Sequence, residues 1–248
     1  MMLKKNINSI KRITVLNLFG KGLIYTTILI ACYLIVGYIL HLAIFPEDKP
    51  EVSSYFKPGH VFESQAEGFR QTVARQENGL VYCYLEIKPY APGPPKHIHT
   101  NFDETFEIEN GELSIWIDGK IKKIKPGETV RIPKGTPHKP FNETSDTIRV
   151  KGAFPFPEGF AFGLVQIYGL MDDDPDFGKF PHTMLMVAPL YQSDFDSYLA
   201  EGPPVFIQKL TSFILTPIAR LMGYKSYYKK YDISMKGNDK AIYLQKNK

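Results

Sequence analysis

Seven short runs with the composition of β-strands follow one another between residues 69 and 153, and they constrain the fold more than any other feature. They are rich in β-branched and aromatic residues, are bounded by turn signals, and cover residues 69–74, 80–88, 104–109, 112–118, 120–125, 129–132 and 147–153. Asn78-Gly79, Asn110-Gly111 and Asp118-Gly119 tolerate positive φ, so these connections are predicted to be hairpins. Strands do not alternate with helices, which argues against a parallel α/β sheet. The pattern predicts a mainly β domain.

Apolar and polar residues alternate along the run 112–118. Leu113, Ile115 and Ile117 share one face, and the intervening residues share the other. One apolar face per strand is typical of a sandwich or barrel with a filled interior.

The run 80–88 also alternates, but its inward face is not decided by the sequence. Tyr82, Tyr84 and Glu86 lie on one face, and small and aliphatic residues lie on the other. If the tyrosine face points inward, these three residues are candidates to contact a substrate or to support metal ligands. The alternative is that the aliphatic face packs in the core.

Three histidines and one glutamate within this region are candidate metal ligands. His97 and His99 are two residues apart, so on a strand both rings point to the same face. Glu104 opens a run in which it shares a face with the apolar residue Phe106, and therefore looks inward. His138 follows later in the same region. Imidazole and carboxylate are ligand types that divalent transition metals accept.

The same residues fall within two sequence motifs. The first is the run 93–104, which holds His97, His99 and Glu104 and is followed by Gly111. The second is GETVRIPKGTPHKPFN, which holds Gly127, Pro133, Gly135, His138 and Asn142. In order and spacing the two motifs resemble the conserved motifs of the cupins, over about residues 75–155. One departure is that Gly93 lies closer to His97 than the leading glycine of the family pattern does.

This resemblance implies a single cupin domain at residues 61–155, folded as a double-stranded β-helix, or jelly-roll, barrel. It also implies one divalent transition metal (Fe, Mn, Ni, Cu or Zn) bound by His97, His99, Glu104 and His138. Cupins often form dimers, so a homodimer is an expectation as well.

The reaction type follows from the resemblance alone, because fold does not fix function. A dioxygenase-type oxidoreductase acting on a small organic molecule is our first hypothesis. The alternative is a non-catalytic module that binds a sugar or another small molecule at the cell envelope. A metal-independent sugar isomerase is disfavoured because such relatives commonly lack the full ligand set. Nucleic-acid binding is not expected, because the net charge of +4 is modest and the basic residues form no long run.

The run from Gly22 to Phe45 contains no Asp, Glu, Lys or Arg and is long enough to cross a ~30 Å hydrocarbon layer as a helix. A cleaved signal peptide is the rival interpretation, but its apolar core is typically only ~7–15 residues. Residues 1–21 are basic and acidic residues follow the run, which predicts a single-pass membrane protein with a cytoplasmic N-terminus and an extracytoplasmic cupin domain. Residues 46–60 are expected to form a linker.

Residues 156–248 are predicted to form a helical extension on the outside of the barrel. Apolar spacing predicts helices over residues 160–171 and 204–223, and a capping residue at Ser193 or Asp194 predicts a third helix ending at Ala200. The helix over 204–223 either packs on the barrel or lies on the membrane surface. His60 and His182 are expected in surface loops, and the acidic cluster at residues 172–176 in a solvated turn.

Overall fold

The computed structural model describes residues 2–44 and 46–233 and divides the chain into two compact units, one ending at Pro46 and one starting at Glu47. The first unit is the helix α1 (Met2–Ile44), in which the stretch Asn17–His41 has a mean hydropathy of 2.2. This helix is long and apolar enough to be a membrane span, and a signal sequence has the same properties. The predicted orientation across a membrane stays a prediction.

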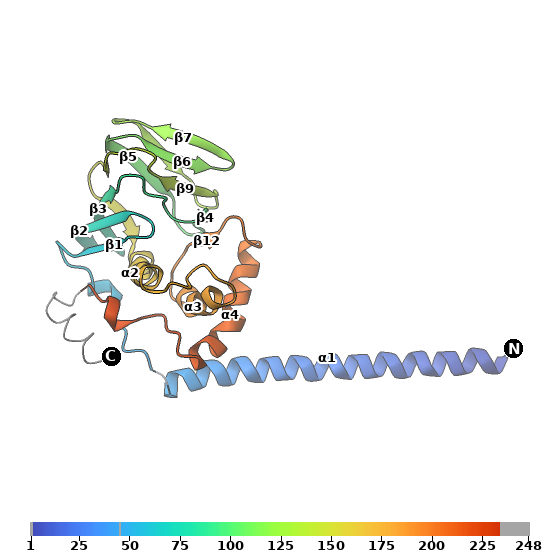
Figure 1. Ribbon diagram of the computed structural model, residues 1–248. Coiled ribbons are helices and arrows are strands. Elements are labelled where there is room, and N and C mark those ends of the chain that lie inside the picture. Colours follow the sequence, from blue (N-terminus) through green and yellow to red (C-terminus); the bar gives the residue numbers. More distant parts are fainter. Residues whose placement is uncertain (1, 45, 234–248) are drawn as a thin grey trace. The chain divides into compact units, whose positions relative to one another are not determined.

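The second unit contains two antiparallel sheets (Figure 1). The seven-stranded sheet has the order β1 (Val61–Ser64), β2 (Phe69–Glu77), β3 (Leu80–Ile87), β10 (Ile148–Val150), β5 (Glu104–Asn110) and β8 (Thr129–Ile132), and β11 (Phe154–Pro157) also pairs with β3. The five-stranded sheet has the order β12 (Tyr198–Leu199), β4 (His97–Ile98), β9 (His138–Phe141), β6 (Leu113–Ile117) and β7 (Lys120–Ile124).

The antiparallel sheets confirm the mainly β prediction, and each of the seven predicted runs contains a strand. The two sheets of the predicted jelly-roll barrel are not closed, because within residues 46–233 no strand pair joins one sheet to the other. Instead, apolar side chains of both sheets fill the interior, including Phe106, Ile108, Leu113 and Ile115, all at most 2% exposed. The edge strands β1 and β12 are short, and the helices α2 and α4 contact them, so one edge of each sheet is covered.

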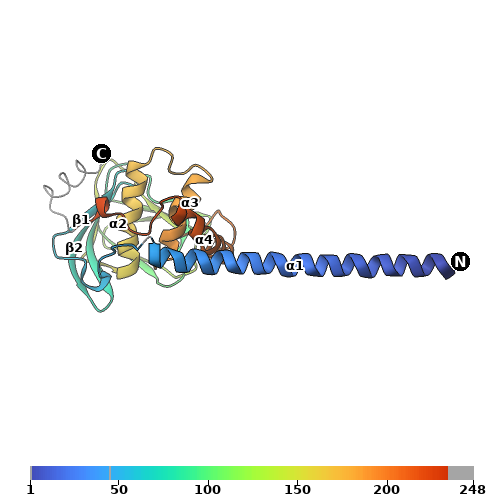
Figure 2. The ribbon, with the colours of Figure 1, turned by 90° about the horizontal axis from the view of Figure 1, so that it is seen from below.

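Three helices gather at one end of the sheets, α2 (Glu158–Asp173), α3 (His182–Tyr191) and α4 (Val205–Leu221). Figure 2, seen from below, shows them in front of the strands. Two short 3-10 helices, η1 (Val52–Ser54) and η2 (Lys229–Tyr231), lie near α2. Ten residues of α2 are buried, so this helix is a core element. Its position confirms the helix predicted over residues 160–171.

The part of the chain after residue 155 does more than cover the sheets from outside. It supplies β12 to the five-stranded sheet, and β11 begins just before it and pairs with β3. The helix predicted from Ser193 or Asp194 to Ala200 is wrong, because this segment is a turn followed by β12. The segment runs extended beside β4, and Asp196 binds the backbone of the loop after that strand.

Helix α4 confirms the prediction over residues 204–223, but its apolar residues do not face the sheets. Its buried residues are mostly small, namely Ser212, Thr216, Pro217 and Ala219, and α4 lies against α3. Its large apolar residues are exposed instead, with Phe206 at 68% and Leu221 at 67%. An amphipathic helix with its apolar side outward is unusual for a core helix.

Candidate metal centre

Both sheets contribute to the cluster of His97, His99, Glu104 and His138. His97 on β4 and His138 on β9 are direct partners across the five-stranded sheet, and His99 follows β4 by one residue. Glu104 is the first residue of β5 in the other sheet and pairs there with Ile132. The four side chains are buried, at 1–7% exposed, and their ligand atoms lie within 4.8 Å of one another. The structure thus brings all four predicted residues together.

Backbone carbonyls hold the three imidazole rings through their Nδ1 atoms. His97 Nδ1 lies 2.8 Å from the Pro95 oxygen and His138 Nδ1 lies 2.9 Å from the Thr136 oxygen. His99 Nδ1 is bonded to the Asp196 oxygen. A carbonyl oxygen only accepts, so each Nδ1 carries a hydrogen, and in a neutral ring the Nε2 then has a free lone pair.

The three Nε2 atoms all face the centre of the cluster. His97 Nε2 lies 3.2 Å from His99 Nε2, and His138 Nε2 lies 2.9 Å from Glu104 Oε2. His99 Nε2 lies 3.6 Å from Glu104 Oε1. In neutral rings, the lone pairs on His97 Nε2 and His99 Nε2 repel each other at this distance unless a positive charge lies between them.

Burial and neighbouring charges set the protonation of this cluster. Burial, together with His99 and His138, lowers the pKa of His97 to about 3, so its ring is neutral. Burial alone would raise the pKa of Glu104, but the neighbouring imidazoles of His99 and His138 outweigh it and lower that pKa. For His138, burial is outweighed by its hydrogen bond to Glu104, which raises the pKa. The cluster therefore favours an ionised carboxylate beside imidazole.

These donors fit a divalent transition metal. Three imidazole nitrogens and one carboxylate oxygen suit Zn, Cu, Fe or Ni. Bonds of about 2.0–2.2 Å require ligand atoms no more than about 4.4 Å apart, so a small contraction of the cluster suffices. Hydrogen bonds from the second ring nitrogen are the usual way in which proteins orient metal-binding histidines, and all three rings have one. The buried cluster could bind a metal.

Residues 83–151 match the family model described as Cupin domain. The matched range contains all four residues of the cluster. It supports the cupin superfamily for this part of the chain, as the resemblance of the two motifs predicted.

Several solved structures are similar to the cupin domain at low sequence identity. A cupin-2 domain containing protein from Shewanella frigidimarina is 23% identical over 35% of this chain and 78% of that chain, with a TM-score of 0.30. A polyketide cyclase from Streptomyces resistomycificus is 21% identical over 44% and 80%, with a TM-score of 0.34. A sugar phosphate isomerase from Silicibacter pomeroyi is 20% identical over 41% and 71%, with a TM-score of 0.32. No curated protein matches the chain.

Asp196 supports the cluster of four side chains, and the sequence did not point to it. Its backbone oxygen holds His99, and its carboxylate accepts from Thr100 N, Thr100 Oγ1 and Asn101 N at 2.6–2.7 Å. Two phenylalanines also fix the His99 ring, because Phe102 stacks on it with centroids 4.3 Å apart and Phe160 meets it edge-on at 5.0 Å. Asp196 and Phe160 lie more than 50 residues along the chain from His99, so no local pattern indicates them.

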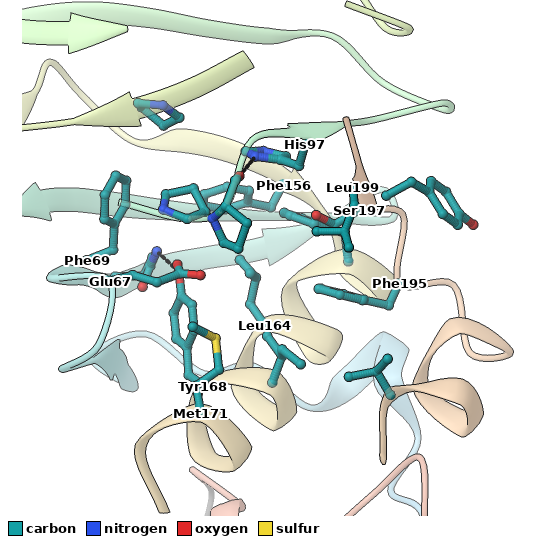
Figure 3. A pocket seen from close by; sticks show the side chains of 18 of the residues that line it. Glu67, Phe69, His97, Phe156, Leu164, Tyr168, Met171, Phe195, Ser197 and Leu199 are labelled. Carbon is teal, nitrogen blue, oxygen red and sulfur yellow. Dashed lines mark hydrogen bonds between the residues drawn. The ribbon is translucent and has the colours of Figure 1, made fainter. Parts of the chain in front are cut away.

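A cavity of about 180 Å³ adjoins the ligand set, and His97 and Glu104 form part of its wall (Figure 3). Most of the remaining wall is apolar, with Phe69 and Phe106 from the large sheet and Phe160 and Leu164 from α2. Tyr198 and Leu199 of β12 close one side. The cavity places a small molecule beside the cluster in largely apolar surroundings.

The tyrosine face of β3 does not point between the two sheets, so Tyr82, Tyr84 and Glu86 lie away from the cluster of His97, His99, Glu104 and His138. Val81, Cys83, Leu85 and Ile87 are the buried residues of this strand. On the opposite face Tyr84 is 55% exposed, Tyr82 lies under the Arg75 guanidinium, and Glu86 pairs with Arg149. The register of β3 in its sheet decides which face is buried, and it places the aliphatic residues between the two sheets.

The remaining histidines and acidic residues lie outside the cluster. His182 begins α3 and its Nε2 lies 2.8 Å from Asp174 Oδ2, so it is not a loop residue. His60 lies in the turn before β1 and accepts from the Lys57 backbone N–H through Nδ1. Asp172 also has a structural role, because it accepts from the backbone N–H groups of residues 65 and 66.

Proposed function

We propose that His97, His99, Glu104 and His138 bind one divalent transition metal, and that the protein is a metal-dependent enzyme of dioxygenase type acting on a small organic molecule. The observation that carries this proposal is the convergence of three Nε2 atoms and one carboxylate, with every Nδ1 bonded to a backbone carbonyl. The hydrogen bonds of the rings orient these atoms for a cation before it binds.

The residues of the chain orient the three histidine rings and exclude water from the cavity. A metal held there would supply Lewis-acid chemistry toward an oxygen of a bound molecule. Pro95, Thr136 and Asp196 hold the three rings, and Phe102 and Phe160 prevent the His99 ring from turning. The apolar cavity wall positions the carbon skeleton of a substrate next to His97 and Glu104 and keeps bulk water away.

Oxygen consumption by the purified protein tests the reaction class. The protein is supplied with Fe, Mn, Ni, Cu or Zn and a panel of small organic molecules, and oxygen uptake that depends on metal and is lost in His99→Ala supports the proposal. A metal-loaded protein that consumes no oxygen with any member of the panel counts against the dioxygenase part.

A non-catalytic binding protein is the second candidate, and the largely apolar cavity favours it as much as catalysis. In that case a molecule would enter the same cavity and leave unchanged. Mass spectrometry of the molecule after incubation with metal-loaded protein distinguishes the two, because turnover changes its mass and binding alone does not.

The membrane is the partner proposed for α1, with the cupin domain outside the cytoplasm. The exposed apolar side of α4 is proposed to lie on the same membrane, at the level of the lipid headgroups. Glu47, the first residue of the second unit, accepts from Ser226 N at 3.0 Å and from Ser226 Oγ. This bond joins the start of the second unit to the segment just after α4.

A further inference from the structure

The cavity has a second polar end that the metal proposal does not use. Figure 3 shows Glu67 and Tyr168 pointing toward each other across the cavity from His97. Glu67 lies in the turn between β1 and β2, Gln71 lies on β2, and Tyr168 lies on α2. All three line the cavity and are at most 7% exposed. A buried polar group at a cavity wall needs a hydrogen-bond partner.

Only one of the two polar atoms of the Gln71 side chain has a hydrogen-bond partner among the residues that the structure describes. Its Nε2 donates to the Tyr168 hydroxyl oxygen at 3.0 Å, but its Oε1 has no hydrogen-bond partner among the residues that the structure describes. A buried acceptor without a partner is costly, which is a reason to expect a donor from outside the chain. Gln71 lines the cavity, so a molecule in the cavity is placed to supply that donor.

The charges around the cavity favour an uncharged molecule. In the metal-free chain no Lys or Arg among residues 46–233 lines it, whereas Glu67 and Glu104 do, so an anion would meet only negative or neutral groups. The mostly apolar wall makes the desolvation of a cation costly as well. Burial and the nearby Asp172 raise the pKa of Glu67 to about 8, against the opposing effects of Lys139 and a hydrogen bond with Tyr168. Glu67 is then protonated near neutral pH and can donate a hydrogen bond.

We propose that the cavity binds a small uncharged molecule with an apolar body and a hydroxyl group, and that Gln71 and Glu67 bind the hydroxyl. This inference rests on the proposed function in treating the molecule as the substrate of the metal centre. A hydroxyl suits this end because it donates to Gln71 Oε1 and accepts from the Glu67 carboxyl at once. A cavity of about 150 Å³ is known to hold a benzene ring, so the body is about one ring in size.

Calorimetric titration of the full chain, freed of metal with a chelator, tests the inference. The probes are phenol, toluene, benzoate and benzylamine at pH 6.5, because they share a ring and differ in the group attached to it. We expect phenol to bind about tenfold or more tightly than toluene, and benzoate and benzylamine to bind more weakly than phenol. Toluene binding as tightly as phenol, or benzoate or benzylamine binding more tightly than phenol, would overturn the inference.

Gln71→Leu removes the free acceptor while keeping the volume close. We expect it to reduce the preference for phenol over toluene to less than about threefold, whereas Gln65→Leu, at an exposed position, should leave it unchanged. A preference that survives in a folded Gln71→Leu protein overturns the assignment of the hydroxyl to Gln71. If Gln71→Leu does not fold, the four probes on the unaltered protein still decide the inference.

Titration of the metal-free protein tests the hydroxyl site separately from the metal centre. A phenol preference in a chain that takes up no metal would contradict the proposed function and leave the hydroxyl site in place. A chain that takes up one metal and does not prefer phenol would contradict only the hydroxyl site.

Discussion

His97 Nε2 lies 3.2 Å from His99 Nε2, and neither nitrogen has a hydrogen to offer in its neutral form, because the Nδ1 atom of each ring is bonded to a carbonyl. Two buried lone pairs at this distance are a local instability that a cation would relieve. The arrangement depends on the carbonyls of Pro95 and Asp196, so residues that hold those carbonyls should control metal affinity.

Asp196→Ala is expected to weaken metal binding about 10–100-fold without removing a ligand. The carboxylate accepts three hydrogen bonds from residues 100 and 101, and its loss frees the loop that carries His99. Isothermal titration with the metal measures the effect. Asp176→Ala is the control, since Asp176 forms an exposed ion pair with Lys179. Equal affinities of the Asp196→Ala and unaltered chains would show that the loop is held by other means.

Gly163→Ala is expected to disturb the cavity as well as the stability. A Cβ on Gly163 would lie 2.3 Å from Phe195 Cδ2, so the ring must move, and Phe195 lines the cavity next to Asp196. Overpacking of this kind costs about 1–3 kcal/mol. Thermal unfolding and a phenol titration measure the two effects.

Gly169→Ala provides the matched control on the same helix. There a Cβ would meet the Tyr231 ring at 2.2 Å, and Tyr231 does not line the cavity beside the metal centre. We expect similar destabilisation but unchanged phenol affinity. If both variants change the affinity equally, the effect of Gly163→Ala is a general loosening and not a local one.

Glu67→Gln is expected to change how stability depends on pH. The pKa of Glu67 is raised by folding to about 8, from 4.5, so the stability it contributes is present below about pH 4.5 and is lost as pH rises toward 8. The free energy of unfolding of the unaltered chain should therefore fall relative to Glu67→Gln over this window, by an amount on the order of a few kcal/mol at ~1.4 kcal/mol per pKa unit.

Denaturant unfolding at intervals from pH 4.5 to 8 measures this difference. Glu63→Gln, where the carboxylate is part of an exposed pair with Lys88, should track the unaltered chain at every pH. A constant difference between Glu67→Gln and the unaltered chain would mean that Glu67 is ionised throughout.

A tryptophan at position 210 tests the membrane contact of α4. Leu210 is half exposed, and Trp116 is the only tryptophan of the chain. In nanodiscs with brominated lipids, the fluorescence of Leu210→Trp in a Trp116→Phe background should be quenched, because bromine quenches indole on contact. The unaltered chain, with Trp116 on β6, should be quenched much less. Equal quenching at both positions would contradict the contact of α4 with lipid.

The longer strands and the four-residue cluster could be predicted because their signals lie in neighbouring residues. Strand alternation located the seven longer runs, and the spacing of the two motifs located His97, His99, Glu104 and His138. The strands β4 and β12 have two residues each, too few for alternation to be visible. They form because His97 pairs with His138 on one side and Leu199 on the other, which are contacts distant in sequence.

The errors came from tertiary contacts that override local propensity. The segment 193–200 has a capping residue and a helical spacing, yet it runs extended because β12 pairs with β4 and Asp196 binds the following loop. A jelly-roll barrel was expected from the resemblance, whereas the two sheets are not closed and helices contact the edge strands β1 and β12. Asp196, Gln71 and Tyr168 gain their roles only through the fold.

Metal content is the most direct test of the central claim that the four residues form a metal centre. The full chain is purified in chelator, incubated with each of Fe, Mn, Ni, Cu and Zn, desalted and measured by elemental analysis. We expect about one metal per chain, lost in His99→Ala and kept in His182→Ala, whose histidine lies outside the cluster. No stoichiometric metal with any of the five, or equal retention by His99→Ala, would contradict the account.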